Sequence, residues 1–167
     1  MVKDAESGSI RLVGLFLIRA EYEQLLVPAD TEVEEVGRGQ VVVDPEGFEV
    51  QLTWREVGDH TVDVRLGLRV KPDDDPEKCP YHVVVEMWGR FDVSDMPAAL
   101  TKASFARRNA AAILMPYARE TIASLTSRGS FGPIRIQPVN IVAMIDDETV
   151  AVEGPDFGLI ETEDEST

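Results

Sequence analysis

Apolar and polar residues alternate along two neighbouring stretches in the first half of the chain. Residues 48–55 read FEVQLTWR and residues 61–70 read TVDVRLGLRV, so apolar side chains recur at every second position. This period of two is typical of strands that bury one face. Because Gly58 and Asp59 between the two stretches are turn-forming residues, the pattern predicts an antiparallel hairpin.

Two longer apolar stretches lie on either side of this hairpin. Residues 10–23 read IRLVGLFLIRAEYE, and Gly14 within them favours a strand over a short helix. Residues 81–93 read YHVVVEMWGRFDV and predict another long strand, in which Gly89 is the expected position of a bulge. The sequence up to residue 93 therefore predicts four strands.

The pattern changes to that of a helix after residue 93. Residues 97–128 are rich in alanine and other strong helix formers; Ser94 or Asp95 is suited to cap the start, and Gly129 to follow the end. Pro116 is expected to kink or divide the helix, because proline lacks a backbone donor and clashes with the preceding turn. The side chains beyond it that recur at helical spacing are expected to face the sheet, namely Tyr117, Ala118, Thr121, Ile122 and Leu125.

This order of elements predicts the fold class. Four strands followed by helices are typical of an α+β fold, with the helices on one face of an antiparallel sheet. The chain has 167 residues, which is the length of one domain, and 44% of them are hydrophobic.

Charge is distributed unevenly along the chain. Its 16 Lys and Arg residues and 31 Asp and Glu residues give a formal net charge of −15, which argues against nucleic acid as a partner. Residues 96–128 contain five basic residues and one acidic residue, whereas residues 146–167 contain nine acidic residues and none that is basic. This composition predicts that the last part of the chain is a disordered, solvated tail.

Signals for secretion, membrane insertion and disulfide bonding are missing from the sequence. The first ten residues lack a basic region followed by an apolar one, and the longest near-apolar stretch, residues 12–18, is far shorter than a membrane span. A single cysteine, Cys79, together with only two histidines, provides neither an internal disulfide nor a structural zinc site. The sequence predicts a cytoplasmic protein.

The sequence contains none of the common motifs for catalysis or nucleotide binding. It has no G-x-S-x-G, no Walker loop and no H-E-x-x-H. Asp73, Asp74 and Asp75 could ligate a hard cation, but a solvated loop is favoured because Gly and Glu at calcium-loop spacing are missing. His60 and His82 could act as acid or base, yet surface or packing roles are favoured. We expect a protein that is not an enzyme and has no cofactor or metal.

One long stretch of the sequence is distinctive. Residues 115–120 read MPYARE, residues 127–131 read SRGSF, and residues 138–141 read PVNI. In this order and spacing they resemble the signature of the SecB family of protein-export chaperones. The predicted strands also precede the helical region in that family's order.

The resemblance implies both an architecture and a function. It covers residues 10–147, so a SecB-like chaperone domain is expected at 1–147 and the acidic tail at 148–167. The implied fold is a four-stranded antiparallel sheet with a long helix and a short C-terminal helix, assembled as a homotetramer of two dimers. The implied function is an ATP-independent holdase, which keeps precursor polypeptides unfolded and passes them to the SecA translocation motor. A holdase needs apolar grooves and a charged, soluble surface but no nucleophile, which fits this composition.

The same resemblance implies candidate residues for client binding. Val50, Leu52 and Trp54 match the strand that borders the client groove, and Ile141 and Met144 match the short helix that covers it. The weaker candidates are Trp88, Met87 and Phe91. An ordinary core position is the alternative for every one of them, and Trp54 is the one most expected to be a partly exposed aromatic.

Two further sets of residues are expected to contact other chains. Tyr117, Arg119 and Glu120 form the most specific part of the signature, and helix packing or subunit assembly is favoured for them over client binding. Typical family members bind SecA through acidic residues on the exposed sheet face, but the corresponding residues 82–84 here include no acid. Glu21 and Glu23 are the remaining candidates for such a patch.

Two other functions stay open. Some SecB-like proteins protect an antitoxin from degradation, and the missing acid at residues 82–84 leaves this role available here. A dedicated interaction module with one fixed partner is the alternative from a different class of protein.

Overall fold

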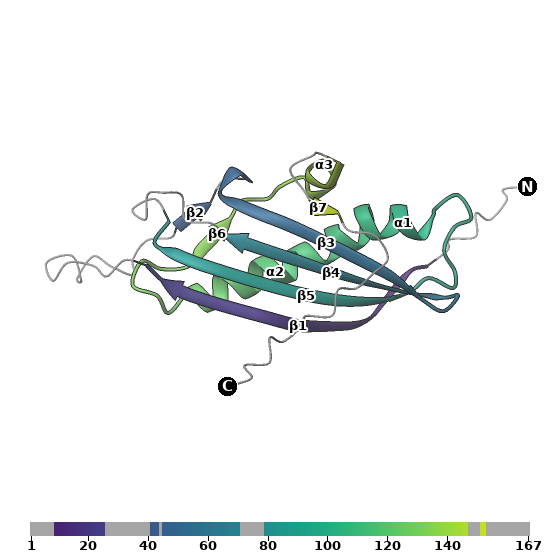
Figure 1. Cartoon of the computed structure of the whole chain (residues 1–167), viewed down its shortest axis with the longest axis horizontal. Coiled ribbons are helices and arrows are strands. Elements are labelled where there is room, and N and C mark those ends of the chain that lie inside the picture. The colour runs from purple at the N-terminus through teal and green to yellow at the C-terminus, as the bar shows by residue number, and fades with distance from the viewer. Residues whose placement is uncertain (1–8, 26–40, 44, 71–78, 147–150, 153–167) are drawn as a thin grey trace, which may run out of the picture.

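The chain forms one main sheet of long antiparallel strands. The computed structural model describes residues 9–25, 41–43, 45–70, 79–146 and 151–152. The main strands are β1 (Arg11–Gln24), β3 (Phe48–Val57), β4 (Thr61–Val70) and β5 (Tyr81–Asp92). They lie in the order β1-β5-β4-β3, and β7 (Ala151–Val152) adds two residues in parallel to the outer side of β3 (Figure 1). The predicted four-stranded antiparallel sheet is thus confirmed.

The helices follow the sheet in sequence and lie on one of its faces (Figure 1). They are α1 (Lys102–Ser104), a π-helical segment (Phe105–Ala110), α2 (Ala111–Thr126) and α3 (Ile141–Asp146). Two short strands, β2 (Val41–Val43) and β6 (Ile134–Ile136), pair in parallel as a separate small sheet, and Pro45–Gly47 form a 3₁₀ turn. The α+β class with helices on one face is confirmed.

The predicted hairpin is formed by β3 and β4. Gly58 in its turn has a φ of 63°, a conformation that favours glycine. Residues at the apolar positions of both strands lie on the face toward the helices and are buried: Phe48, Val50, Leu52 and Trp54 on β3, and Val62, Val64, Leu66, Leu68 and Val70 on β4. The period of two in the sequence therefore selects the buried face.

The helical region begins later than predicted. Thr101 is the N-cap residue, and its hydroxyl accepts a hydrogen bond from the Ser104 N–H at 3.1 Å. The prediction that Ser94 or Asp95 caps the helix is wrong, because Ser94 instead donates through its N–H and its hydroxyl to the Asp92 carboxylate. These bonds close a turn at the end of β5.

Pro116 does not divide the helix, so that part of the prediction is wrong, whereas a kink at this position stays a prediction. It lies inside α2, on its exposed side, and the irregular part of the helical region is the π-helical segment that precedes α2. The expected sheet-facing set was partly wrong, because Tyr117 is 44% exposed, whereas Ala118 and Ile122 are buried and Leu125 is half-buried against the core. The buried face of α2 consists of Ala111, Leu114, Met115, Ala118, Ile122, Ala123 and Thr126.

Gly89 has a packing role and not the predicted bulge. Strand β5 pairs with β4 without a register shift, and both shifts in the sheet lie in β1, at Leu12/Gly14 and Leu17/Arg19. A Cβ at Gly89 would lie 2.7 Å from Leu114 Cδ2, which is too close for any side chain. Glycine at this position lets α2 approach the sheet.

Several predictions fall on residues that the structure does not describe. The aspartate run at residues 73–75 lies outside the described residues, and so does the acidic tail apart from β7. Within the described part of the chain, no helix is long and apolar enough to cross a membrane.

Candidate functional site

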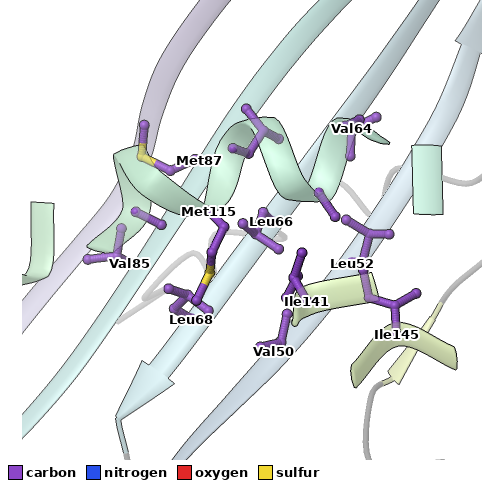
Figure 2. Close-up of a cluster of buried hydrophobic side chains, with 14 of the residues drawn as sticks. Val50, Leu52, Val64, Leu66, Leu68, Val85, Met87, Met115, Ile141 and Ile145 are labelled. Carbon is purple, nitrogen blue, oxygen red and sulfur yellow. The ribbon is translucent and has the colours of Figure 1, made fainter. Parts of the chain in front are cut away.

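The sheet face above β3 is covered by the short helix α3. Ile141 and Ile145 project from α3 and are each only 5% exposed. They lie in the same buried apolar cluster as Val50 and Leu52 of β3, as Figure 2 shows. The spacing of four residues places both isoleucines on one side of the helix. In the structure these residues pack as core positions, which fits the alternative of an ordinary core, and their role in client binding stays a prediction.

Few interactions hold α3 in place. The Asn140 side-chain oxygen accepts a hydrogen bond from the Ala143 N–H at 3.2 Å and so caps the start of the helix. The helix has six residues, far fewer than the ~12 that an isolated helix needs for marginal stability in water. Its helical state therefore depends on docking against the sheet and the π-helical segment.

The predicted client-binding residues divide between the two faces of the sheet. Val50, Leu52, Trp54, Met87, Phe91 and Ile141 are buried on the covered face, and Met144 is half-buried there. Trp88 lies on the opposite face, beside Phe16 of β1 at a ring distance of 5.2 Å. Met144 is the member of this set on α3 whose side chain stays partly accessible to solvent.

Trp54 is more buried than the sequence predicted. It is only 8% exposed, so the prediction of a partly exposed aromatic is wrong. Its indole Nε1 is buried and has no hydrogen-bond partner among the described residues. A buried donor without an acceptor costs free energy.

The opposite, open face of the sheet carries paired charges. Asp63 of β4 accepts hydrogen bonds from Arg90 at 2.7 Å and 2.9 Å, and from Arg55 at 3.1 Å and 3.2 Å. Burial acts to raise the pKa of Asp63, but the hydrogen bonds and positive charges of Arg90 and Arg55 outweigh it and hold that pKa below its ordinary value. Arg90 also lies over the Trp88 ring, 5.3 Å from its centre.

A second carboxylate on this face is paired in the same way. Glu86 of β5 forms ion pairs with Arg65 of β4 and with Arg19 of β1, and Arg19 also pairs with Glu21. Acidic and basic side chains thus alternate across the strands. This face is not the continuous acidic surface that the family resemblance implies for SecA binding.

Glu21 and Glu23 of β1 lie beside residues 82–84 of β5, the stretch without an acidic residue. In the β1–β5 register, Glu21 is opposite Val84 and Glu23 is opposite His82, and both carboxylates are on exposed residues. The neighbouring strand therefore supplies two acids at the place where β5 has none. The register that produces this arrangement depends on two bulges in β1, which the sequence did not reveal.

The signature residues of α2 point toward solvent and toward β6. Arg119 and Glu120 line a hollow of about 150 Å³ together with residues of α2 and β6, namely Pro116, Ala123, Ile134, Arg135 and Ile136. Tyr117 is exposed on the same helix, four residues after the exposed Ile113. No contact of these residues with a second chain is part of the structure, so their role in assembly stays a prediction.

The signature after α2 ties the helix end to the sheet. The Phe131 N–H donates to the Tyr81 hydroxyl at 2.9 Å, and the Ser130 N–H donates to the Gln24 side-chain oxygen at 3.0 Å. A Cβ at Gly129 would lie 2.5 Å from the hydroxyls of Tyr22 and Tyr81, so any other residue would require these tyrosines to move. These residues position the segment that leads to α3, and their partners Tyr81 and Gln24 lacked a signal in the sequence.

Among the residues that the structure describes, no three side chains of His, Cys, Asp or Glu are grouped so that they could hold a metal ion. Cys79 is buried, and His60 is exposed in the β3–β4 turn.

The comparison with protein families agrees with the signature and the fold. The family model for preprotein translocase subunit SecB matches residues 39–151. The chain belongs to the SecB family. Membership of this family supports a chaperone role.

Individual relatives are similar over different parts of the chain. The protein-export protein SecB of Dechloromonas aromatica (strain RCB) is 34% identical over 119 residues, which cover 69% of this chain and 77% of that protein. The uncharacterized protein MJ0357 of Methanocaldococcus jannaschii is 36% identical over 69 residues, which cover 41% of this chain and only 43% of that protein.

A solved structure supports the SecB-like fold. The Mycobacterium tuberculosis SecB-like chaperone Rv1957, in complex with a ChAD peptide from the Rv1956 HigA1 antitoxin, superimposes with a TM-score of 0.53. The match covers 78% of this chain and 87% of Rv1957 at 14% sequence identity, which shows a shared fold.

Proposed function

We propose that this SecB family member is an ATP-independent holdase of the cytoplasm. It binds unfolded precursor polypeptides through the apolar face of β3 and delivers them to the Sec export machinery. The absence of catalytic and nucleotide-binding motifs from the sequence fits passive binding, and the net charge of −15 keeps a protein with an apolar binding surface soluble.

The observation that carries this proposal is the weakness of the cover over β3. Helix α3 has six residues and one side-chain cap, and it packs against the apolar core, the π-helical segment and α2. A helix this short is expected to undock at a lower free energy than that of global unfolding. Val50 and Leu52 then become accessible to extended chains, which offer scattered apolar side chains that folded proteins bury. Met144, already half-buried at this surface, is an adaptable contact for many different clients.

Aggregation suppression with a matched pair of variants tests the proposal. Wild-type protein should keep several unrelated unfolded proteins soluble without nucleotide, as measured by light scattering. Met144→Asp should weaken this protection severalfold, because an unpaired carboxylate in an apolar contact is costly. Ala143→Asp adds the same charge at the neighbouring exposed position and should protect like wild type. Equal protection by both variants contradicts the assignment of this surface.

Self-association is part of the proposed function. Among the described residues, large apolar side chains are exposed on the edge strand β1 and on α2: Val13, Phe16, Leu17, Ile18, Tyr22, Ile113 and Tyr117. Such residues are typical of surfaces that are covered in an assembly, and the family resemblance implies a homotetramer. Light scattering coupled to size exclusion should return about four times 18.4 kDa, and a monomer at micromolar concentration contradicts this part of the proposal.

Docking to the SecA motor is proposed through Glu21 and Glu23. The double variant Glu21→Gln, Glu23→Gln should weaken binding to SecA in a calorimetric titration, whereas Glu46→Gln, in the 3₁₀ turn away from β1, should not. The charge pairing of the rest of this face favours one alternative, which is protection of an antitoxin. Wild-type protein that fails to bind SecA but prevents degradation of an antitoxin supports that alternative.

A further inference from the structure

The hollow between helix α2 and strand β6 has the volume of a small-molecule site. It measures about 150 Å³, and protein cavities of this size hold ligands as large as benzene. The helix lines it with Pro116, Arg119, Glu120 and Ala123, which share one helix face because they are three or four residues apart. Strand β6 lines the other side.

The two sides of the hollow are joined by hydrogen bonds. The Ile134 N–H donates to the Thr126 hydroxyl of α2 at 2.8 Å, and both residues are completely buried. Strand β6 also pairs with β2 over all three of its residues. The position of β6 beside α2 is therefore fixed, so a ligand has little ordering entropy to overcome when it enters.

Two arginines line the hollow, Arg119 from α2 and Arg135 from β6. In the part of the chain that the structure describes, neither forms an ion pair. The Nε atom of Arg119 is buried and has no hydrogen-bond partner among the described residues. A buried donor without an acceptor is costly, and the donors of a guanidinium lie in one planar fork that matches a carboxylate. An anion in the hollow is the ligand that these arginines fit.

The lining also defines the charge and shape of that anion. Glu120 is the one acidic residue among the lining residues, so the two arginines and this glutamate leave a formal charge of +1. This balance favours a monoanion over a phosphate dianion or a dicarboxylate. Ala123, Ile134 and Ile136 are buried and apolar, which favours an aliphatic group over an anion that is hydrated on all sides.

We propose that this hollow binds a carboxylate carried on a short aliphatic group. Arg119 and Arg135 bind the carboxylate, and the aliphatic group contacts Ile134 and Ile136. Two sources offer this chemistry, a free short-chain acid and the C-terminal carboxylate of a peptide that ends in an aliphatic residue. The inference goes beyond the proposed holdase function and does not depend on it.

The first test titrates the full chain with isovalerate and follows isoleucine δ1-methyl resonances by NMR. The methyl groups of Ile134 and Ile136 should shift and saturate, whereas those of Ile141 and Ile145, beneath α3, should not. Isovaleramide has the same shape without the charge and should bind about tenfold more weakly or worse. Shifts confined to Ile141 and Ile145 overturn the inference, because the acid then enters the apolar core beneath α3.

The second test changes the charges around the hollow. Arg119→Gln and Arg135→Gln should each raise the Kd for isovalerate about tenfold, and Glu120→Gln, which removes the opposing charge, should lower it severalfold. Arg128→Gln is the matched control, because Arg128 is exposed beyond the end of α2 and does not line the hollow. Equal affinity of Arg135→Gln and Arg128→Gln overturns the inference.

The third test identifies the source of the carboxylate. N-acetylleucine carries the carboxylate of a peptide C-terminus, so its binding with the same dependence on the two arginines assigns the site to peptide ends. Binding of isovalerate alone assigns it to free acids. Tighter binding of inorganic phosphate than of either acid contradicts the proposed ligand class.

A second copy of the chain is the competing occupant of the hollow. If neither acid shifts Ile134 or Ile136, the inference is overturned. Light scattering coupled to size exclusion then gives the reason: a smaller assembly for Arg119→Gln and Arg135→Gln, but not for Arg128→Gln, shows that a carboxylate of a neighbouring subunit fills the hollow.

Discussion

Helices α2 and α3 cover the same face of one sheet but differ in how firmly they are attached. Helix α2 has 16 residues, buries seven of them and lies across β4 and β5, whereas α3 has six residues and lies on β3 through Ile141 and Ile145 (Figures 1 and 2). The strands beneath the two helices are equally apolar. We therefore expect the two covers to differ: α2 should belong to the permanent core, whereas α3 covers the surface that the proposed function requires to become accessible.

The largest effect is expected beneath α2. Leu114 is completely buried and touches the sheet at Gly89, so Leu114→Ala should lower the free energy of unfolding by about 3 kcal/mol. Ser124→Ala, on the exposed side of the same helix and outside the proposed assembly surface, should lower it by less than about 0.5 kcal/mol. Urea denaturation followed by circular dichroism measures both, and similar losses for the two variants contradict the division of the helix faces.

A smaller loss of stability is expected when the ion pairs that link β3, β4 and β5 are removed. Asp63 of β4 links Arg55 of β3 to Arg90 of β5 on the open face. Asp63→Asn should lower the free energy of unfolding by about 2 kcal/mol. This is less than the loss of a fully buried ion pair, because both arginines are more than one third exposed.

This contribution of Asp63 depends on pH in a defined direction. Its pKa is lower in the folded protein than in the unfolded chain, so the stabilisation is present above the unfolded pKa and is lost as pH falls through the folded pKa. The stability difference between wild type and Asp63→Asn should thus be constant near neutral pH and shrink below about pH 4. A difference that grows on acidification contradicts the pairing.

A more limited loss is expected beneath α3. Ile145 is nearly as buried as Leu114, but Ile145→Ala should lower the global free energy of unfolding by only about 1 kcal/mol. The reason is that the loss cannot exceed the free energy that docks α3, after which the helix leaves and the rest of the core stays folded. A loss as large as that of Leu114→Ala shows instead that α3 belongs to the same cooperative unit as α2.

The smallest effect is expected at the cap of α3. Asn140→Ala removes the acceptor of the Ala143 N–H. It should lower the stability of helix α3 by about 0.5 kcal/mol and leave the rest of the fold unaffected. Amide hydrogen exchange should become faster in Ile141–Asp146 and stay unchanged in Ala111–Thr126. Ser124→Ala, an exposed position on α2, serves as the control and should alter neither segment.

Much of the fold could be predicted from local pattern. The alternation in residues 48–55 and 61–70 identified the hairpin and its buried face, and the composition after residue 93 identified the helical region. The signature at residues 115–141 identified the SecB family. The errors concern residues whose roles depend on neighbours in space: Thr101 caps the helix, Pro116 is tolerated within α2, and Gly89 accommodates Leu114.

The sequence by itself determined the spacing of the apolar residues and the family to which the chain belongs. Both properties depend on the order of residues within short stretches of the chain. Only the tertiary structure decided that α3 fills the expected groove, that β7 lies on the edge of β3, and that Glu21 and Glu23 lie beside the stretch without an acid. These features depend on register, on bulges and on contacts between segments up to about a hundred residues apart. Periodicity along a chain specifies which face is buried, but only packing in three dimensions specifies what covers it.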